Sequence, residues 1–131
     1  MKNITIGLAQ TIQTADLPRN RETIFRFIEQ ASEAGVEILC FPECQTVGYR
    51  VDITAADLPC PEMELDTLHK EVAQRCAHNN MSCILGTETP VVDSKPYNSA
   101  LVIDSDGTVL GRHHKTRLTP LDALAYSPGN Q

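Results

Sequence analysis

Strand and helix patterns alternate along residues 4–85, and this order restricts the fold more than any other feature of the sequence. Short apolar segments at residues 4–9, 36–41 and 81–85 each predict a strand. Because strands that are joined through helices run parallel and cross over with one hand, the two intervening helices belong on the same face of the sheet. We therefore predict an α/β fold with its helices on one face.

Both helix segments carry apolar residues three and four positions apart. The first pattern lies in "NRETIFRFIEQASEAG", where Gly35 marks the end of the helix. The second helix ends at the Asn79 and Asn80 pair. Its apolar positions include Leu65, Leu68, Val72 and Cys76.

Two details of the strands can be predicted from residue type. Ile4, Ile6 and Leu8 alternate with other residues in the first strand, which predicts that the side of the strand they share is buried. Gly86 is expected to close the third strand, because glycine is a common strand breaker.

An antiparallel hairpin is predicted for residues 99–112. The segments "YNSALVID" and "TVLGRHHK" flank "SDG", and Gly107 takes the turn position that needs a positive φ. Lys115 closes the second strand of this hairpin. The hairpin extends the parallel strands, so the sheet as a whole is predicted to be mixed.

The charge balance limits the class of partner. The 131 residues include 11 Lys and Arg against 17 Asp and Glu, a net charge of −6, and the basic residues are scattered. This distribution argues against nucleic acid or an anionic membrane as a partner and favours small molecules. The opening "MKNITIGLAQ" lacks the features of a secretory signal, and no later segment is apolar enough to span a bilayer, so we expect a cytoplasmic protein.

The cysteine and histidine residues favour neither disulfides nor metal. Five cysteines are an odd number and contain no CxxC pair, so reduced thiols are expected. The four histidines lack the spacing of a zinc site. The five cysteines are Cys40, Cys44, Cys60, Cys76 and Cys83.

An ordered set of short motifs runs along the whole chain. "IGLAQ" opens it, "FPE" and "GY" follow the second strand, "ILG" lies in the third, and "YNSALVIDSDGTVLGRHHKTRLTP" leads to "YSPG". Each motif alone is weak, but together and in this order they resemble the nitrilase or carbon-nitrogen hydrolase superfamily. The resemblance implies half of an αββα sandwich, with residues 1–131 as the N-terminal part of a hydrolase domain that is truncated here.

The resemblance also implies an activity and its residues. Members of the superfamily hydrolyse non-peptide carbon-nitrogen bonds in small amides, nitriles or carbamoyl compounds through a Cys, Glu and Lys triad, without cofactor or metal. Glu43 matches the general base and Lys115 the lysine that stabilises the oxyanion. Asp122 lies near the position of a second acidic residue of the family. Pairing of subunits in the family implies a homo-oligomer.

The chemistry explains why these residue types are needed. A cysteine attacks as the thiolate, so a nearby carboxylate must take its proton, pass it to the departing amine and then activate water. A fixed cation stabilises the negative charge that builds on the substrate. If Glu43 and Lys115 have these roles, their charged ends should lie within about 3 to 6 Å of each other.

The nucleophile of the triad has no match among the five cysteines. In the family it follows a later strand, beyond the "PG" at residues 128–129. Cys44 adjoins Glu43, but neighbouring side chains in an extended segment point to opposite faces, and Cys40 is expected in the core. The chain alone is therefore expected to be inactive.

Two alternatives to a hydrolase follow from the same residues. The chain could be a non-catalytic product that keeps the half-sandwich and serves as an interaction module. A nucleotide-binding doubly wound domain is disfavoured, because neither GxGxxG nor GxxxxGK[ST] follows any strand.

Overall fold

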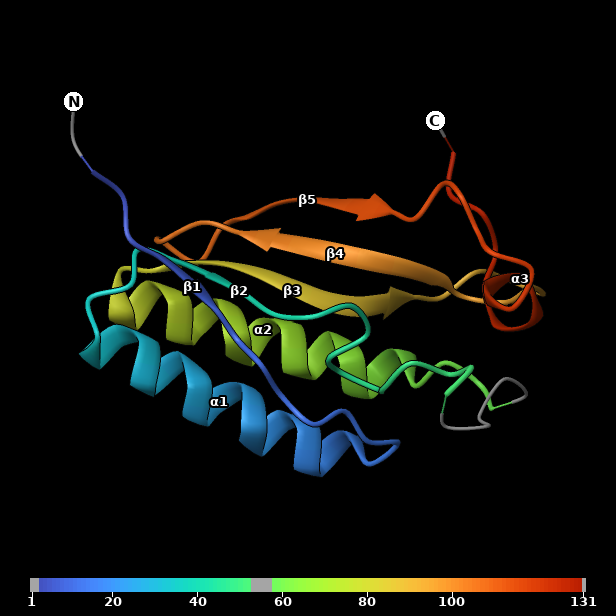
Figure 1. The fold of residues 1–131 in the computed structure, drawn as a ribbon, viewed down its shortest axis with the longest axis horizontal. Helices are drawn as coiled ribbons and strands as arrows, with labels where there is room; N and C mark the ends of the chain where they lie inside the picture. Colours follow the sequence, from blue (N-terminus) through green and yellow to red (C-terminus); the bar gives the residue numbers. More distant parts are fainter. Residues whose placement is uncertain (1–2, 53–57, 131) are drawn as a thin grey trace.

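A five-stranded mixed sheet with two long helices on one face forms the protein (Figure 1). The structure is a computed structural model and describes residues 3–52 and 58–130. The elements in chain order are β1 (Ile6–Leu8), α1 (Leu17–Glu33), β2 (Ile38–Cys40), α2 (Glu62–Asn79), β3 (Ser82–Thr89), β4 (Tyr97–Ile103), β5 (Val109–His114) and α3 (Asp122–Ala125).

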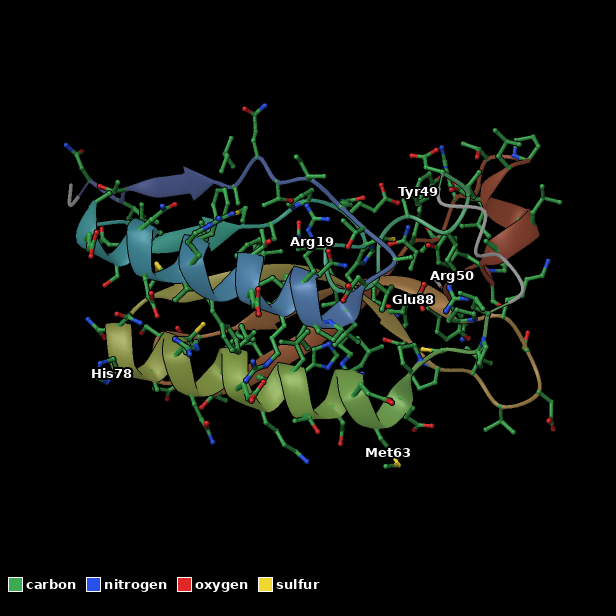
Figure 2. All side chains as sticks on the ribbon, turned by 90° about the horizontal axis from the view of Figure 1, so that it is seen from below. Arg19, Tyr49, Arg50, Met63, His78 and Glu88 are labelled. Carbon is green, nitrogen blue, oxygen red and sulfur yellow. The ribbon has the colours of Figure 1, made fainter. Side chains whose placement is uncertain are left out.

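The strand order in the sheet follows the chain, β1-β2-β3-β4-β5. β1, β2 and β3 pair parallel, whereas β4 and β5 add antiparallel neighbours. α1 and α2 lie side by side, below the sheet in Figure 1 and in front of it in Figure 2. The predicted α/β class, the parallel strands, the hairpin and the single helical face are therefore confirmed.

The helix ends follow local signals. α1 begins earlier than the apolar pattern indicates, because Asp16 caps it by accepting a hydrogen bond from the Arg19 amide at 3.1 Å. Gly35 follows the helix with φ 72°, and Asn80 ends α2 with φ 48°. Both residues adopt the left-handed conformation that commonly terminates a helix, as predicted.

The prediction that Gly86 closes the third strand is wrong. β3 continues through Gly86 to Thr89, and it pairs with β4 from Cys83 opposite Ile103 to Thr89 opposite Tyr97. A glycine inside a strand can instead mark a place where another backbone segment comes close. At Gly86 that segment is the turn that carries Glu43.

The hydrophobic core fills the space between the helices and the sheet. Burying one large aliphatic side chain stabilises the folded state by roughly 1.5–3 kcal/mol, so the side chains of this core provide most of the free energy that favours folding. The fully or almost fully buried residues of the core are Ile24 and Ile28 of α1, Leu68, Val72 and Cys76 of α2, and Leu39, Cys83, Leu85, Leu101 and Ile103 of the sheet.

The opposite face of the sheet exposes apolar side chains. Ile4, Ile6 and Leu8 are 59%, 59% and 78% exposed, so the prediction that their side of the strand is buried is wrong. The helices cover the alternate side, where Gly7 lies against Val36 and Leu39 and leaves little space for a larger residue. Cys40 pairs with Leu8, lies on the same face and is half-buried rather than part of the core. We call this surface the open face.

A histidine is buried between α2 and the sheet. His69 is 5% exposed, its Nε2 lies 2.8 Å from the Thr87 hydroxyl, and the Arg112 guanidinium approaches Nδ1 at 3.4 Å. Because a guanidinium only donates, Nδ1 accepts and the Nε2 proton points to Thr87. Burial, reinforced by the charge of Arg112, lowers the pKa of His69 to about 4.

This arrangement predicts a loss of stability in mild acid. Between pH 6.5 and about 4, unfolded His69 binds a proton that folded His69 does not, so acidification removes up to about 3 kcal/mol of unfolding free energy. Urea unfolding at pH 7 and pH 4.5 measures this loss. His69→Gln should reduce it, whereas His78→Gln, at an exposed position of the same helix, should leave it unchanged. An equal loss in both variants would contradict the prediction.

Candidate active site

The turn after β2 places Glu43 on the open face of the sheet. Cys44 adopts φ 56°, and the turn folds so tightly over β3 that a Cβ on Gly86 would lie 2.0 Å from the Pro42 carbonyl oxygen and 2.8 Å from the Cys44 nitrogen. The Thr46 amide donates to the Gly86 carbonyl at 3.2 Å. The absence of a side chain at Gly86 therefore makes room for the turn that presents Glu43.

Lys115 reaches Glu43 from the end of β5. It directly follows β5, and its amide donates to the Asn98 carbonyl at 2.8 Å, which fixes its backbone against β4. Its ammonium nitrogen lies 2.8 Å from Glu43 Oε1. The two residues are 72 positions apart, so the predicted proximity is present as a direct salt bridge.

Asp122 holds the same ammonium from the protein interior. Asp122 Oδ2 lies 3.1 Å from Lys115 Nζ and accepts a hydrogen bond from the Thr119 amide at 2.9 Å. In return the Asp122 amide donates to the Thr119 hydroxyl at 3.1 Å, and the Tyr49 hydroxyl donates to Asp122 Oδ1. The carboxylate is fully buried, while Lys115 is 32% and Glu43 is 50% exposed.

The charges in this cluster shift each other's proton affinity. Burial opposes the charged form of Lys115, but hydrogen bonds and charge from Glu43 and Asp122 outweigh burial and raise the lysine pKa. Burial likewise opposes ionisation of Asp122, but hydrogen bonds from Tyr49, Thr119 and Lys115 lower its pKa to about 2. Both residues are therefore charged at neutral pH.

The structure adds a residue that the sequence analysis missed. Asn98 lies at the start of β4, is 3% exposed, and donates its side-chain amide to Glu43 Oε1. Within the described part of the chain, Oε1 takes hydrogen bonds from Asn98 and Lys115, and Oε2 takes none. The "YN" motif contained a usable signal, because a polar amide at a buried strand position needs a hydrogen-bond partner.

A cavity of about 350 Å³ opens beside the ion pair. Glu43 and Lys115 both line it, together with the small residues Gly86 and Ala100, which pair with each other across β3 and β4. The other wall residues are Phe41, Ile84, Asn98, Ser99 and His113. The cavity can hold a small polar molecule beside a paired carboxylate and cation.

None of the five cysteines is placed as a nucleophile for this cavity. Cys44 packs with Ala125 and Tyr126, its sulfur lies 3.3 Å from the Tyr126 hydroxyl, and burial raises its thiol pKa to about 12. The backbone at Cys44 is left-handed rather than extended, which differs from the geometry assumed in the sequence analysis. Burial also raises the pKa of Cys60 to about 12. Such thiols are poor nucleophiles at neutral pH.

Metal and membrane sites are not evident in the described residues. In residues 3–52 and 58–130, no three His, Cys, Asp or Glu side chains converge in a way that could hold a metal ion. No helix in these ranges combines the length and apolar character needed to cross a bilayer.

Glu43 and Lys115 thus bring a carboxylate and a cation together at one cavity, beyond the ends of β2 and β5, and this arrangement marks a candidate active site. The chain belongs to the carbon-nitrogen hydrolase family, whose model matches residues 5–131. The predicted superfamily is therefore confirmed.

Several relatives show the same similarity. Omega-amidase NIT2-B from Xenopus laevis is 27% identical over 123 residues, which cover 93% of this chain and 43% of the relative. The nitrilase and fragile histidine triad fusion protein NitFhit from Caenorhabditis elegans is 29% identical over 124 residues, 89% of this chain and 27% of the relative. The chain thus spans less than half the length of these curated relatives.

Solved amidase structures share the fold. An amidase from Nesterenkonia sp. superposes with a TM-score of 0.83 at 24% identity, over 98% of this chain and 49% of that one. A mutant of the Nesterenkonia sp. AN1 amidase in complex with butyramide gives the same TM-score and coverage. This similarity supports the fold independently of the sequence motifs.

The close approach at Gly86 predicts a severe effect of a single methyl group. Gly86→Ala places a Cβ 2.0 Å from the Pro42 carbonyl oxygen, so the turn must move. The free energy of unfolding should therefore fall by about 3 kcal/mol. Gly111→Ala is the matched control on β5, where a Cβ meets nothing within 4 Å, and should change stability by less than about 0.5 kcal/mol. Urea unfolding measures both, and equal stability of the two variants would refute the close approach.

Proposed function

We propose that the chain supplies the base and the oxyanion-stabilising cation for hydrolysis of small, non-peptide amides and related nitrile or carbamoyl compounds. The observation that carries the proposal is the 2.8 Å contact between Glu43 and Lys115 at the edge of a cavity. Family membership supports hydrolysis of a carbon-nitrogen bond. A neighbour in fold, the Nesterenkonia amidase, has been crystallised with butyramide and acrylamide, which supports small amides as the substrate class.

Glu43 moves the protons in this proposal. Oε1 is held by Asn98 and Lys115, so Oε2 is the oxygen that takes the thiol proton of the nucleophile. The thiolate attacks the amide carbon, and Glu43 then gives the proton to the nitrogen, which leaves as ammonia or amine. Glu43 next deprotonates the water that attacks the thioester, and the sulfur regains a proton as the acid is released.

Lys115 stabilises the tetrahedral intermediates. When the thiolate adds to the carbonyl, the electron pair moves to the oxygen, and the Lys115 ammonium lies beside the cavity to receive that charge. Its raised pKa keeps it protonated throughout the cycle. Asp122 fixes the ammonium from behind and leaves Glu43 half-exposed to the reactants.

The proposal places the nucleophile outside residues 1–131, which then form the N-terminal part of a hydrolase domain. Support comes from the five cysteines, none of which faces the cavity. The proposal also includes assembly into a cytoplasmic homo-oligomer.

A second candidate function is a non-catalytic interaction module. The exposed side chains of Ile4, Ile6 and Leu8 favour it, because a row of apolar residues on a sheet face is typical of a surface that contacts other protein. This candidate needs neither Glu43 nor Lys115, so the two functions can be separated by mutation.

A chimera tests the hydrolase proposal. Residues 5–131 replace the matching part of the Nesterenkonia amidase, in a chimera designed to retain that amidase's active-site cysteine. We expect no ammonia from butyramide with the chain alone and measurable release with the chimera. Glu43→Gln should reduce the chimera's rate by roughly 10²-fold or more, and Lys115→Met by a similar factor.

The chimera experiment includes a control variant, and two results would contradict the proposal. Glu64→Gln removes an exposed carboxylate of α2 and should leave the rate unchanged. A folded chimera that keeps its rate after Glu43→Gln would contradict the role of Glu43. Ammonia release by the chain alone that disappears in Glu43→Gln would show that the nucleophile lies within residues 1–131.

A further inference from the structure

Tyr49 connects the segment after β2 to the charge cluster. It lies 73 positions before Asp122 in sequence, and its hydroxyl donates to Asp122 Oδ1. The face of its ring also lies 6.0 Å from Lys115 Nζ. Tyr49 therefore hydrogen-bonds one member of the Lys115 and Asp122 ion pair and lies near the other.

We infer that Tyr49 is a positioning residue that fixes Asp122 through its hydroxyl and thereby holds the Lys115 ammonium at the cavity. The inference rests on the proposed function for the catalytic importance of Lys115. Of the two Asp122 oxygens, Oδ2 accepts a hydrogen bond from the Thr119 amide and pairs with Lys115, and Oδ1 accepts a hydrogen bond from Tyr49. Loss of the Tyr49 hydrogen bond would leave one oxygen of a buried carboxylate without this donor, and the carboxylate could rotate away from Lys115.

The Tyr49 ring is itself held in place. It stacks on Tyr126 with 6.0 Å between ring centroids and 13° between planes. The Tyr126 hydroxyl accepts from the Arg50 amide at 3.0 Å, and the Arg50 guanidinium makes hydrogen bonds of 2.5 and 2.7 Å to Glu88. The side chains of Arg50 and Glu88 are 4% and 0% exposed. Figure 2 shows Tyr49, Arg50 and Glu88 together at the end of the molecule that carries α3.

The pKa values of Tyr49 and Asp122 keep the tyrosine hydroxyl protonated as a donor and the carboxylate ionised as an acceptor. The hydrogen bond to Asp122, together with burial, raises the pKa of Tyr49 to about 12, so the hydroxyl keeps its proton at neutral pH. The same hydrogen bond is one of the interactions that lower the pKa of Asp122 to about 2. Tyr49 thus donates, and Asp122 accepts, over the whole range in which an amide hydrolase would work.

Removal of a single oxygen separates this role from simple packing. Tyr49→Phe keeps the ring, its stacking and its contact with Lys115, but it cannot donate to Asp122. Tyr126→Phe is the matched control, because it removes the hydroxyl of the other ring in the same stack, which bonds Cys44 and the Arg50 amide rather than Asp122.

The experiment follows the Asp122 carboxyl carbon by NMR in protein labelled with ¹³C-aspartate, with the signal assigned through Asp122→Asn. In the parent the Asp122 titration midpoint should lie near 2. In Tyr49→Phe it should rise by about one pH unit, and in Tyr126→Phe it should stay at the parent value. Equal midpoints in the parent and Tyr49→Phe, or an equal rise in both variants, would overturn the inference.

A measurement on the parent covers the case in which Tyr49→Phe fails to fold. A hydroxyl proton that is bonded to a buried carboxylate exchanges slowly with water, so a Tyr49 hydroxyl resonance should be visible near neutral pH and should disappear in Asp122→Asn. Rapid exchange of this proton in the parent would overturn the inference. Neither readout involves hydrolysis, so an inactive chimera with a protected Tyr49 hydroxyl would refute only the proposed function.

Discussion

The contact between Lys115 and the buried Asp122 is the interaction on which the rest of the site depends. A buried carboxylate is costly unless it is paired and hydrogen-bonded, and here its partners come from three separate places in the chain. Tyr49 belongs to the segment after β2, Lys115 follows β5, and Thr119 precedes α3. Satisfying this one charge therefore joins the C-terminal segment to both the hairpin and the turn region.

The two carboxylates that share Lys115 differ in what they can do. Asp122 is buried, its oxygens are occupied and its pKa is low, so it stays ionised and cannot exchange protons near neutral pH. Glu43 is half-exposed and lines the cavity, and among the described residues Asn98 and Lys115 bind its Oε1 while none donates to Oε2. In the proposed mechanism, Asp122 holds the cation and Glu43 transfers the proton, and the close approach at Gly86 positions Glu43.

Sequence patterns predicted the parts of this structure that depend on local periodicity or on position at a strand end. The element order and the hairpin are of this kind. The meeting of Glu43 with Lys115 was instead implied by the family resemblance, because no local pattern brings together residues that are 72 positions apart. The "YN" motif could indicate that Asn98 needs a hydrogen-bond partner, but the partners of Asn98 and Tyr49 could not be identified, because they depend on register between distant segments. The apolar side of β1 was assigned to the wrong face, since alternation shows that two faces differ but not which one the helices cover. The "TPLD" segment did contain a local signal for the Thr119 and Asp122 pair, in the spacing of a capping box.

The most direct test of the account is a pair of double-mutant cycles, with Lys115→Met combined with Asp122→Asn or with Glu43→Gln, measured by urea unfolding at pH 7. The account predicts a coupling of about 2 kcal/mol between Lys115 and buried Asp122, and less than about 1 kcal/mol between Lys115 and half-exposed Glu43. No measurable coupling to Asp122, or a coupling to Glu43 as large as that to Asp122, would contradict the claim that Asp122 anchors the lysine while Glu43 stays free to react.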